Sequence, residues 1–111
     1  MVTIASEKIF ETKVKNYIES VGGWQVKFFA NGMTKKGIPD VLACVNGYFV
    51  AIEVKAQNGR PSELQLYQCR KIWDAGGFAF ILYPSGFDRF KAFIEDLKID
   101  KFNREMEMIL K

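Results

Sequence analysis

The sequence contains no histidine, and it has only two cysteines among its 111 residues. The absence of histidine excludes His-based catalytic triads, zinc sites with histidine ligands and acid–base catalysis by imidazole. Cys44 and Cys69 lie too far apart in the sequence for a zinc knuckle, and two cysteines do not make a disulfide framework. We therefore expect both to be buried free thiols in a reducing compartment.

Long hydrophobic runs and targeting segments are also missing. The longest uncharged and mostly apolar stretch, residues 41–52, is interrupted by Asn46-Gly47, so no transmembrane segment is predicted. Residues 1–7 carry neither the basic segment nor the apolar run of a signal peptide. We expect an intracellular protein that does not associate with a membrane.

Apolar residues are plentiful enough for one compact domain. They make up 49% of the chain, charged residues make up 26%, and no linker separates two halves. The sequence therefore predicts a single domain over residues 1–111. A formal net charge of +3 permits a nucleic-acid partner without requiring one.

Hydrophobic periodicity predicts an α/β fold with the element order α-β-β-β-α-β-α-α, a mixed sheet flanked by helices. A capping box, in which Ser62 is followed by Gln65, marks the start of the second helix, and Gly76-Gly77 marks its end. In the first strand Trp24 and Val26 alternate with polar residues, which is typical of a half-buried strand. Helices are expected over 4–21, 62–75, 87–97 and 102–110, and strands over 24–29, 41–45, 48–54 and 78–83.

The strongest local signal is Asn46-Gly47 between two apolar runs, which predicts a two-residue hairpin turn. With this turn Val45 lies opposite Tyr48, and further along the pair Asp40 lies opposite Glu53. Both faces of the hairpin are apolar, so we expect it to lie between other layers.

Two carboxylates would thus meet at the end of an otherwise apolar hairpin, with Cβ atoms about 5 Å apart. Left alone they repel, and one takes up a proton, whereas a hard divalent cation such as Mg²⁺ removes the conflict. Lys55 projects from the same face as Glu53, while Val54 points into the opposite layer. Carboxylates, metal and an ammonium on one face suit phosphodiester hydrolysis. The alternative is that Asp40 caps a loop and that Glu53 and Lys55 form a solvated pair.

The residues Gly37-Ile38-Pro39-Asp40, followed by Glu53-Val54-Lys55, resemble the PD-(D/E)xK nuclease signature. A preceding helix with Glu11, the Asn-Gly hairpin and a following helix with Gln65 are similar to the VRR-NUC family (virus-type replication-repair nucleases). More distantly they resemble archaeal Holliday junction resolvases. The resemblance covers about residues 6–84 and is least informative over the C-terminal helices 87–110. It implies a restriction-endonuclease-like core.

The resemblance also implies roles for individual residues. Lys55 matches the signature lysine, and Gln65 matches a glutamine on the helix that follows. Metal ligands for Mg²⁺ or Mn²⁺ would be Glu11, Asp40, Glu53 and the Val54 carbonyl; DNA contacts would come from Lys27, Lys35, Lys36 and Arg60. Three alternatives stay open: Glu11 favouring the helix dipole, Gln65 acting only as a helix cap, and the loop lysines being merely solvated.

The expected function is a Mg²⁺- or Mn²⁺-dependent DNA endonuclease that acts on branched DNA, mainly four-way junctions, as a homodimer. Alternatives are a homing- or flap-type endonuclease, a DNA-binding module that keeps the nuclease fold without catalysis, and a structural subunit of a larger assembly. The apolar stripes over 87–97 and 102–110 either form the dimer interface or close the core of one chain.

Overall fold

The computed structural model describes residues 4–97 of the chain, and these form three helices, four strands and one short 3₁₀ turn. The order confirms the predicted α-β-β-β-α-β-α, and the last predicted helix, over 102–110, lies outside the described residues. No helix among residues 4–97 is both long and apolar enough to cross a membrane. The elements are α1 Ile4–Ser20, β1 Trp24–Lys27, β2 Val41–Val45, β3 Tyr48–Val54, α2 Glu63–Asp74, β4 Phe78–Leu82, η1 Pro84–Gly86 and α3 Phe87–Asp96.

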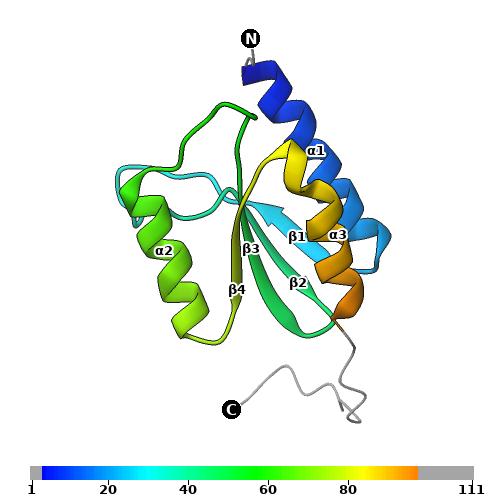
Figure 1. Cartoon of the computed structure of the whole chain (residues 1–111). Coiled ribbons are helices and arrows are strands. Elements are labelled where there is room, and N and C mark those ends of the chain that lie inside the picture. Colours follow the sequence, from blue (N-terminus) through cyan, green and yellow to red (C-terminus); the bar gives the residue numbers. More distant parts are fainter. Residues whose placement is uncertain (1–3, 98–111) are drawn as a thin grey trace.

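The four strands form one mixed sheet in the order β1-β2-β3-β4. β1, β2 and β3 pair antiparallel, and β4 pairs parallel with β3. Helices α1 and α3 lie on one side of this sheet and α2 lies on the other (Figure 1). The prediction of a mixed sheet flanked by helices is confirmed, and the arrangement is that of a restriction-endonuclease-like fold.

The larger core lies between the sheet and the pair α1 and α3. Phe10 of α1 meets the ring of Phe87 edge-on, with centroids 5.4 Å apart. Phe90 and Ile94 of α3 are buried in this core. Of the two alternatives for the apolar stripe over 87–97, closing the core of one chain is therefore the one observed. The other fully enclosed members are Val14, Ile18, Val41, Ala43, Val45, Val50, Ile52 and Val54.

The smaller core lies under α2, where Cys69 packs with Ala51 and Ala79. The prediction of a buried thiol is confirmed for Cys69 and is wrong for Cys44, which is exposed on β2. The reason is that α2 packs on β3 and β4 and does not extend over this end of β2. The hairpin is therefore covered fully on one face and only partly on the other.

Strand β1 alternates as predicted, but its apolar side is the open one. Trp24 is 63% exposed and Val26 is also exposed. The polar side faces α1, where the amide of Gln25 donates a hydrogen bond to Glu19 at 3.0 Å and the ammonium of Lys27 bonds to Glu11. Polar pairing with α1 thus decides which side of this edge strand is turned inward.

The hairpin register is confirmed along its whole length, from Val45 opposite Tyr48 to Val41 opposite Ile52. Asn46 has φ of 52° and Gly47 has φ of 89°. Two consecutive positive φ angles are what a type I′ turn requires, and this turn matches the twist of the strands. The residues that follow this ladder outward are Asp40 and Glu53.

The loop that leads into Asp40 is fixed against α2 at Gly37. Gly37 has φ of +83°, and a Cβ added there would lie 2.5 Å from the carbonyl carbon and oxygen of Leu64. One residue earlier, the backbone carbonyl of Lys36 accepts a hydrogen bond from the amide of Gln68 at 3.2 Å. Close backbone contact therefore holds this loop in place.

We predict that Gly37→Ala destabilises the protein by about 1–3 kcal/mol, because a left-handed backbone and a backbone clash coincide at this position. The matched control is Gly32→Ala, where an added Cβ meets no atom within 4 Å. Thermal unfolding followed by circular dichroism should show a lower midpoint for Gly37→Ala and little change for Gly32→Ala. Equal midpoints would show that the loop does not depend on this contact.

Candidate active site

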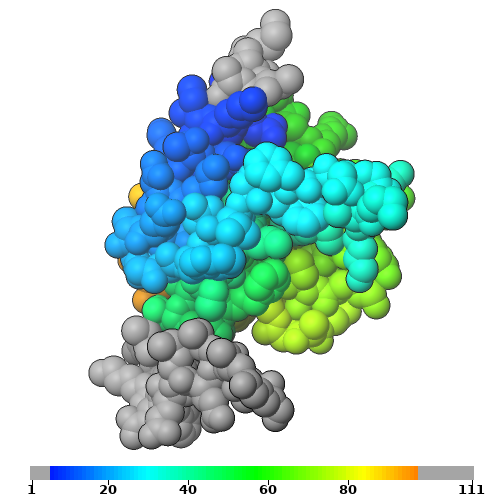
Figure 2. Space-filling view, turned by 180° about the vertical axis from the view of Figure 1, so that it is seen from behind, coloured from blue at the N-terminus to red at the C-terminus, as the bar shows by residue number. Residues whose placement is uncertain are grey.

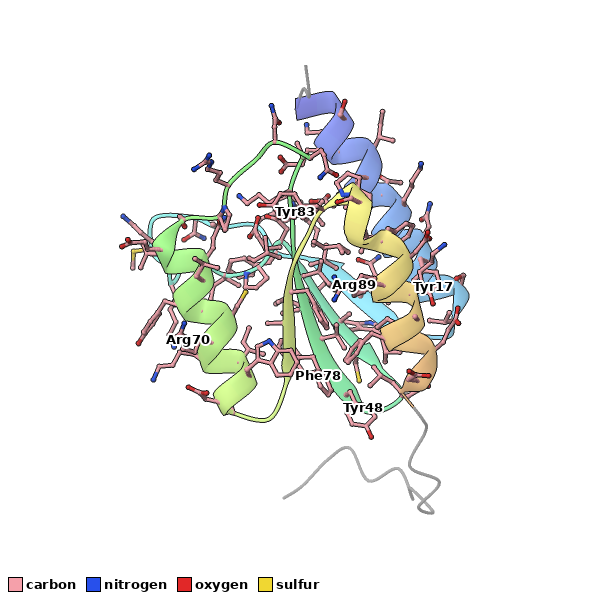
Figure 3. All side chains as sticks on the ribbon, viewed as in Figure 1. Tyr17, Tyr48, Arg70, Phe78, Tyr83 and Arg89 are labelled. Carbon is pink, nitrogen blue, oxygen red and sulfur yellow. The ribbon has the colours of Figure 1, made fainter. Side chains whose placement is uncertain are left out.

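The charged residues of the predicted site come together at one end of the sheet, where β3 and β4 end near the labelled Tyr83 (Figure 3). Asp40 directly precedes β2, and Lys55 directly follows β3. Both are held by backbone bonds that continue the ladders: Phe28 N–H donates to the Asp40 carbonyl at 2.7 Å, and Lys55 N–H donates to the Leu82 carbonyl at 2.9 Å. The site therefore sits on the rigid ends of strands.

Glu53 is the one charged residue in the buried part of the described structure, with 3% of its surface exposed. Burial, a hydrogen bond with Asp40 and the negative charges of Asp40 and Glu7 together raise the pKa of the Glu53 carboxyl to about 8, against the opposing charge of Lys55. One member of the carboxylate pair thus takes up a proton near neutral pH, as the hairpin register predicts.

An ammonium group lies on each side of the carboxylate pair. Lys55 Nζ is 3.7 Å from Glu53 Oε2, and Lys27 Nζ is 3.6 Å from Asp40 Oδ1. The Val54 side chain is fully buried in the core under α1 and α3, so it lies on the other face of the strand, as predicted. The site is therefore an acidic pair between two cations.

Glu11 reaches this group through Lys27. The Lys27 ammonium donates to Glu11 Oε1 at 2.5 Å, and Lys15 Nζ lies 3.4 Å from Glu11 Oε2. Burial lowers the pKa of Lys27, but the hydrogen bond to Glu11 and the charge of Asp40 outweigh it and raise the pKa above its usual value. Lys27 is thus a permanent cation at the site.

The donor set at the site fits a hard divalent cation. Asp40 and Glu53 supply adjacent carboxylate oxygens, and a divalent cation would replace the proton that the pair otherwise retains. The backbone carbonyl of Val54, at the end of β3, is a further oxygen that a hard cation can use as a ligand. Among residues 4–97 no three His, Cys, Asp or Glu side chains come close enough together to hold a metal by themselves. The site therefore offers two carboxylates, with Glu11 kept apart from them.

Gln65 makes both bonds of the predicted capping box. Ser62 N–H donates to Gln65 Oε1 at 2.9 Å, and Gln65 N–H donates to Ser62 Oγ at 3.1 Å. The helix-cap role is confirmed, whereas a catalytic role for Gln65 stays a prediction.

The cations expected to contact DNA are divided between two loops and a strand. Lys35 and Lys36 are exposed in the loop before Asp40, and Arg60 is exposed in the loop after Lys55. Lys27 is turned toward Glu11 and Asp40 instead of toward solvent. The first three are thus free to meet a ligand that approaches the end of the sheet.

The loop after Lys55 is anchored by contacts that the sequence did not reveal. The Gln57 side chain bonds to Ser85 twice, accepting from its N–H and donating to its Oγ, both at 3.0 Å. The Tyr83 hydroxyl donates to the Gly59 carbonyl at 2.8 Å. Lys15 was also missed, although its i,i+4 spacing from Glu11 is the usual signal for such a pair.

The raised pKa of Glu53 predicts how stability depends on pH when metal is removed. Below its usual pKa of 4.5 the carboxyl is protonated in both the folded and the unfolded chain. Between 4.5 and about 8 only the folded state retains the proton, so the free energy of unfolding falls as pH rises through this range. Thermal unfolding in EDTA should show this fall, and Glu53→Gln should reduce it.

The control for this prediction is Glu63→Gln, at an exposed carboxylate on α2. It should leave the pH profile unchanged. A Glu53→Gln profile as steep as that of the unsubstituted protein would show that another group causes the loss.

Comparison with known proteins assigns the chain to a family. The family model of archaeal Holliday junction resolvases (Hjc) matches residues 6–104, a range that contains every residue of the site. No curated protein matched the sequence. The sequence resembles the VRR-NUC family and, more distantly, archaeal Holliday junction resolvases. The family model confirms the resolvase resemblance and does not show the VRR-NUC family. The chain belongs to the archaeal Holliday junction resolvase (Hjc) family of the PD-(D/E)xK nuclease superfamily.

Proposed function

We propose that this member of a nuclease family is a divalent-metal-dependent endonuclease that cuts four-way DNA junctions as a homodimer. The observation that carries the proposal is the contact between buried Glu53 and Asp40, flanked by the ammonium of Lys55. Placing a buried acidic group beside a second, partly buried one is unfavourable without a cation, and in a nuclease this cost is offset when a metal binds.

In this proposal Asp40, Glu53 and the Val54 carbonyl hold Mg²⁺ or Mn²⁺, and Glu11 assists directly or through water. A bound divalent cation would supply an activated water and would neutralise charge on the phosphate. Lys55, 3.7 Å from Glu53, is placed to orient that water and to stabilise negative charge that develops on the phosphate. Gln65 lies on the neighbouring helix, and its predicted catalytic role is part of the proposal.

DNA contacts are assigned to the exposed cations on both sides of the site. Lys35 and Lys36 precede Asp40, and Arg60 follows Lys55 in a loop that Gln57 fixes to Ser85. Cations in these places would contact the backbone on either side of the cleaved phosphate. The DNA contact expected from Lys27 stays a prediction, because its ammonium is held by two carboxylates.

Three finer predictions also belong to the proposal. Residues 1–111 form one nuclease domain, the chain acts inside the cell where its DNA substrate is found, and the closer resemblance to the VRR-NUC family over residues 6–84 stays a prediction. The carboxylate and lysine positions of the signature are all present, which favours catalysis over a binding module that only holds DNA.

We predict that Asp40→Asn reduces cleavage of a labelled four-way junction by more than about 100-fold, since losing even an outer-shell partner of a metal ligand costs 10–100-fold. The fold should persist, because Asp40 is only partly buried. The measurement is cleavage rate in Mg²⁺ or Mn²⁺, with EDTA as the metal-free reference. Flaps, single strands and plain duplex serve as competing substrates.

The matched control is Asp88→Asn, where the carboxylate is almost fully exposed on α3. Its cleavage rate should equal that of the unsubstituted protein. Full activity of Asp40→Asn would remove Asp40 from the site. Binding of junctions without metal-dependent cleavage would instead identify a binding module, and preference for flaps would favour the flap-type alternative.

The proposed dimer has a candidate surface on the open face of the sheet. Strand register places Trp24 beside Cys44 and Cys44 beside Phe49, which forms a row across β1, β2 and β3. Trp24, Cys44 and Phe49 are all exposed, and the adjacent Val26 is exposed as well. We call these four residues the open strip. Figure 2 shows this back of the molecule, where light-blue β1 lies beside the green hairpin.

A second copy of the chain is the occupant that fits the open strip. The strip contains no charged side chain, so two copies related by a two-fold axis would bring no like charges together. The strip also lies outside the acidic site, so pairing through it leaves both sites accessible. Two sites are what a four-way junction requires, because it must be cut on two opposed strands.

We predict that Trp24→Glu converts the dimer into a monomer, because burying an unpaired charge at an apolar interface is unfavourable. Light scattering at micromolar concentration measures the mass directly. The control is Ile9→Glu on α1, where the side chain is exposed to a similar degree, 61%, outside the open strip. A bulky maleimide on exposed Cys44 should also dissociate the dimer. A monomer before substitution, or an unchanged dimer after it, would contradict the assignment.

A further inference from the structure

One ammonium group joins three separate parts of the chain at the site. Lys27, the last residue of β1, places its Nζ 2.5 Å from Glu11 Oε1 on α1 and 3.6 Å from Asp40 Oδ1 at the start of β2. Its side chain is 27% exposed, which is less than expected of a lysine that meets only solvent. Lys27 is therefore part of the acidic site.

The position of Lys27 separates Glu11 from the carboxylate pair. One carboxylate oxygen of Glu11 faces the Lys27 ammonium and the other faces the Lys15 ammonium, so both oxygens of Glu11 are already paired with cations of the chain. The described residues accordingly hold no cluster of three metal-ligating side chains, although Glu11, Asp40 and Glu53 all lie at the same end of the sheet. The ammonium of Lys27 lies between Glu11 and Asp40.

We propose that Lys27 is a positioning residue that acts as a built-in cation and weakens the affinity of the site for divalent metal. This inference rests on the proposed metal-dependent function. A positive charge in contact with Asp40 repels an incoming divalent cation, and the bond of Lys27 to Glu11 competes for a third carboxylate. In the absence of metal the same charge offsets the repulsion between the acids.

The surroundings leave room for Lys27 to give up this position. A hollow between α1 and β1 is lined by Glu7, Glu11, Lys15 and Lys27, so the lysine stem borders open space. Metal binding would then be coupled to a movement of the Lys27 head group away from Asp40. An ordinary phosphate contact would have its ammonium directed toward solvent, whereas this ammonium is directed toward two carboxylates.

The test is the dissociation constant for Mn²⁺, measured by isothermal titration calorimetry without DNA. Lys27→Met keeps the length of the stem and removes the charge, and Mn²⁺ should bind at least about tenfold more tightly, since a nearby charge commonly changes a site's affinity for a cation by this much. Lys27→Arg should retain the weaker, unsubstituted affinity. The Mg²⁺ concentration for half-maximal junction cleavage should fall in parallel for Lys27→Met.

The matched control is Lys15→Met, which removes a cation from Glu11 without touching Asp40. It should leave the dissociation constant within about twofold, because charge effects weaken with distance and solvent. Thermal unfolding checks that each variant is folded. If Lys27→Met does not fold, Lys27→Gln is measured in its place.

Two results would overturn the inference. An unchanged Mn²⁺ affinity in folded Lys27→Met, with weaker DNA binding, would make Lys27 a phosphate contact. An equal gain in Lys15→Met would show a general charge effect. Failure of the proposed function is distinguishable, because then the unsubstituted protein would bind no Mn²⁺ and would not need it for cleavage.

Discussion

The register of the hairpin between β2 and β3 determines where Asp40, Glu53 and Lys55 lie at the site. The Asn46-Gly47 turn sets Val41 opposite Ile52, and the next pair outward is Asp40 and Glu53. A slip of one residue would turn Glu53 to the opposite face of the sheet and place Val54 at the site. A register error would also bury a carboxylate in the main core, so the apolar packing under α1 and α3 selects the same register that the site requires.

Burial and charge act against each other at this end of the sheet. The same strand that fills the core with Val50, Ile52 and Val54 carries Glu53 into a buried position. The carboxyl tolerates this by taking up a proton and by the nearby charge of Lys55. The chain thus folds around a site whose ionised form is favourable only when a cation is present. In the proposed function a divalent cation would take the place of the proton that Glu53 otherwise retains.

The parts of the structure that could be predicted from sequence are those fixed by local chemistry. The Asn-Gly turn, the Ser62–Gln65 capping box and the meeting of Asp40 with Glu53 depend on a few neighbouring residues. The parts that could not be predicted depend on what packs against an element. Alternation in β1 distinguishes two sides but does not say which one α1 covers, and the exposure of Cys44 depends on where α2 ends.

The partners of Glu11 show the same limit at the site itself. Its place on α1 follows from helical periodicity, but the bond to Lys27 depends on how α1 crosses β1. An edge strand with a polar inner side is a consequence of this crossing, because Lys27 cannot reach Glu11 unless Trp24 and Val26 face outward. The ion pair at the site and the open strip therefore both follow from the orientation of β1, with its polar side toward α1. A chain that placed the apolar side of β1 inward would lose both the internal cation beside Asp40 and the surface suited to a second copy.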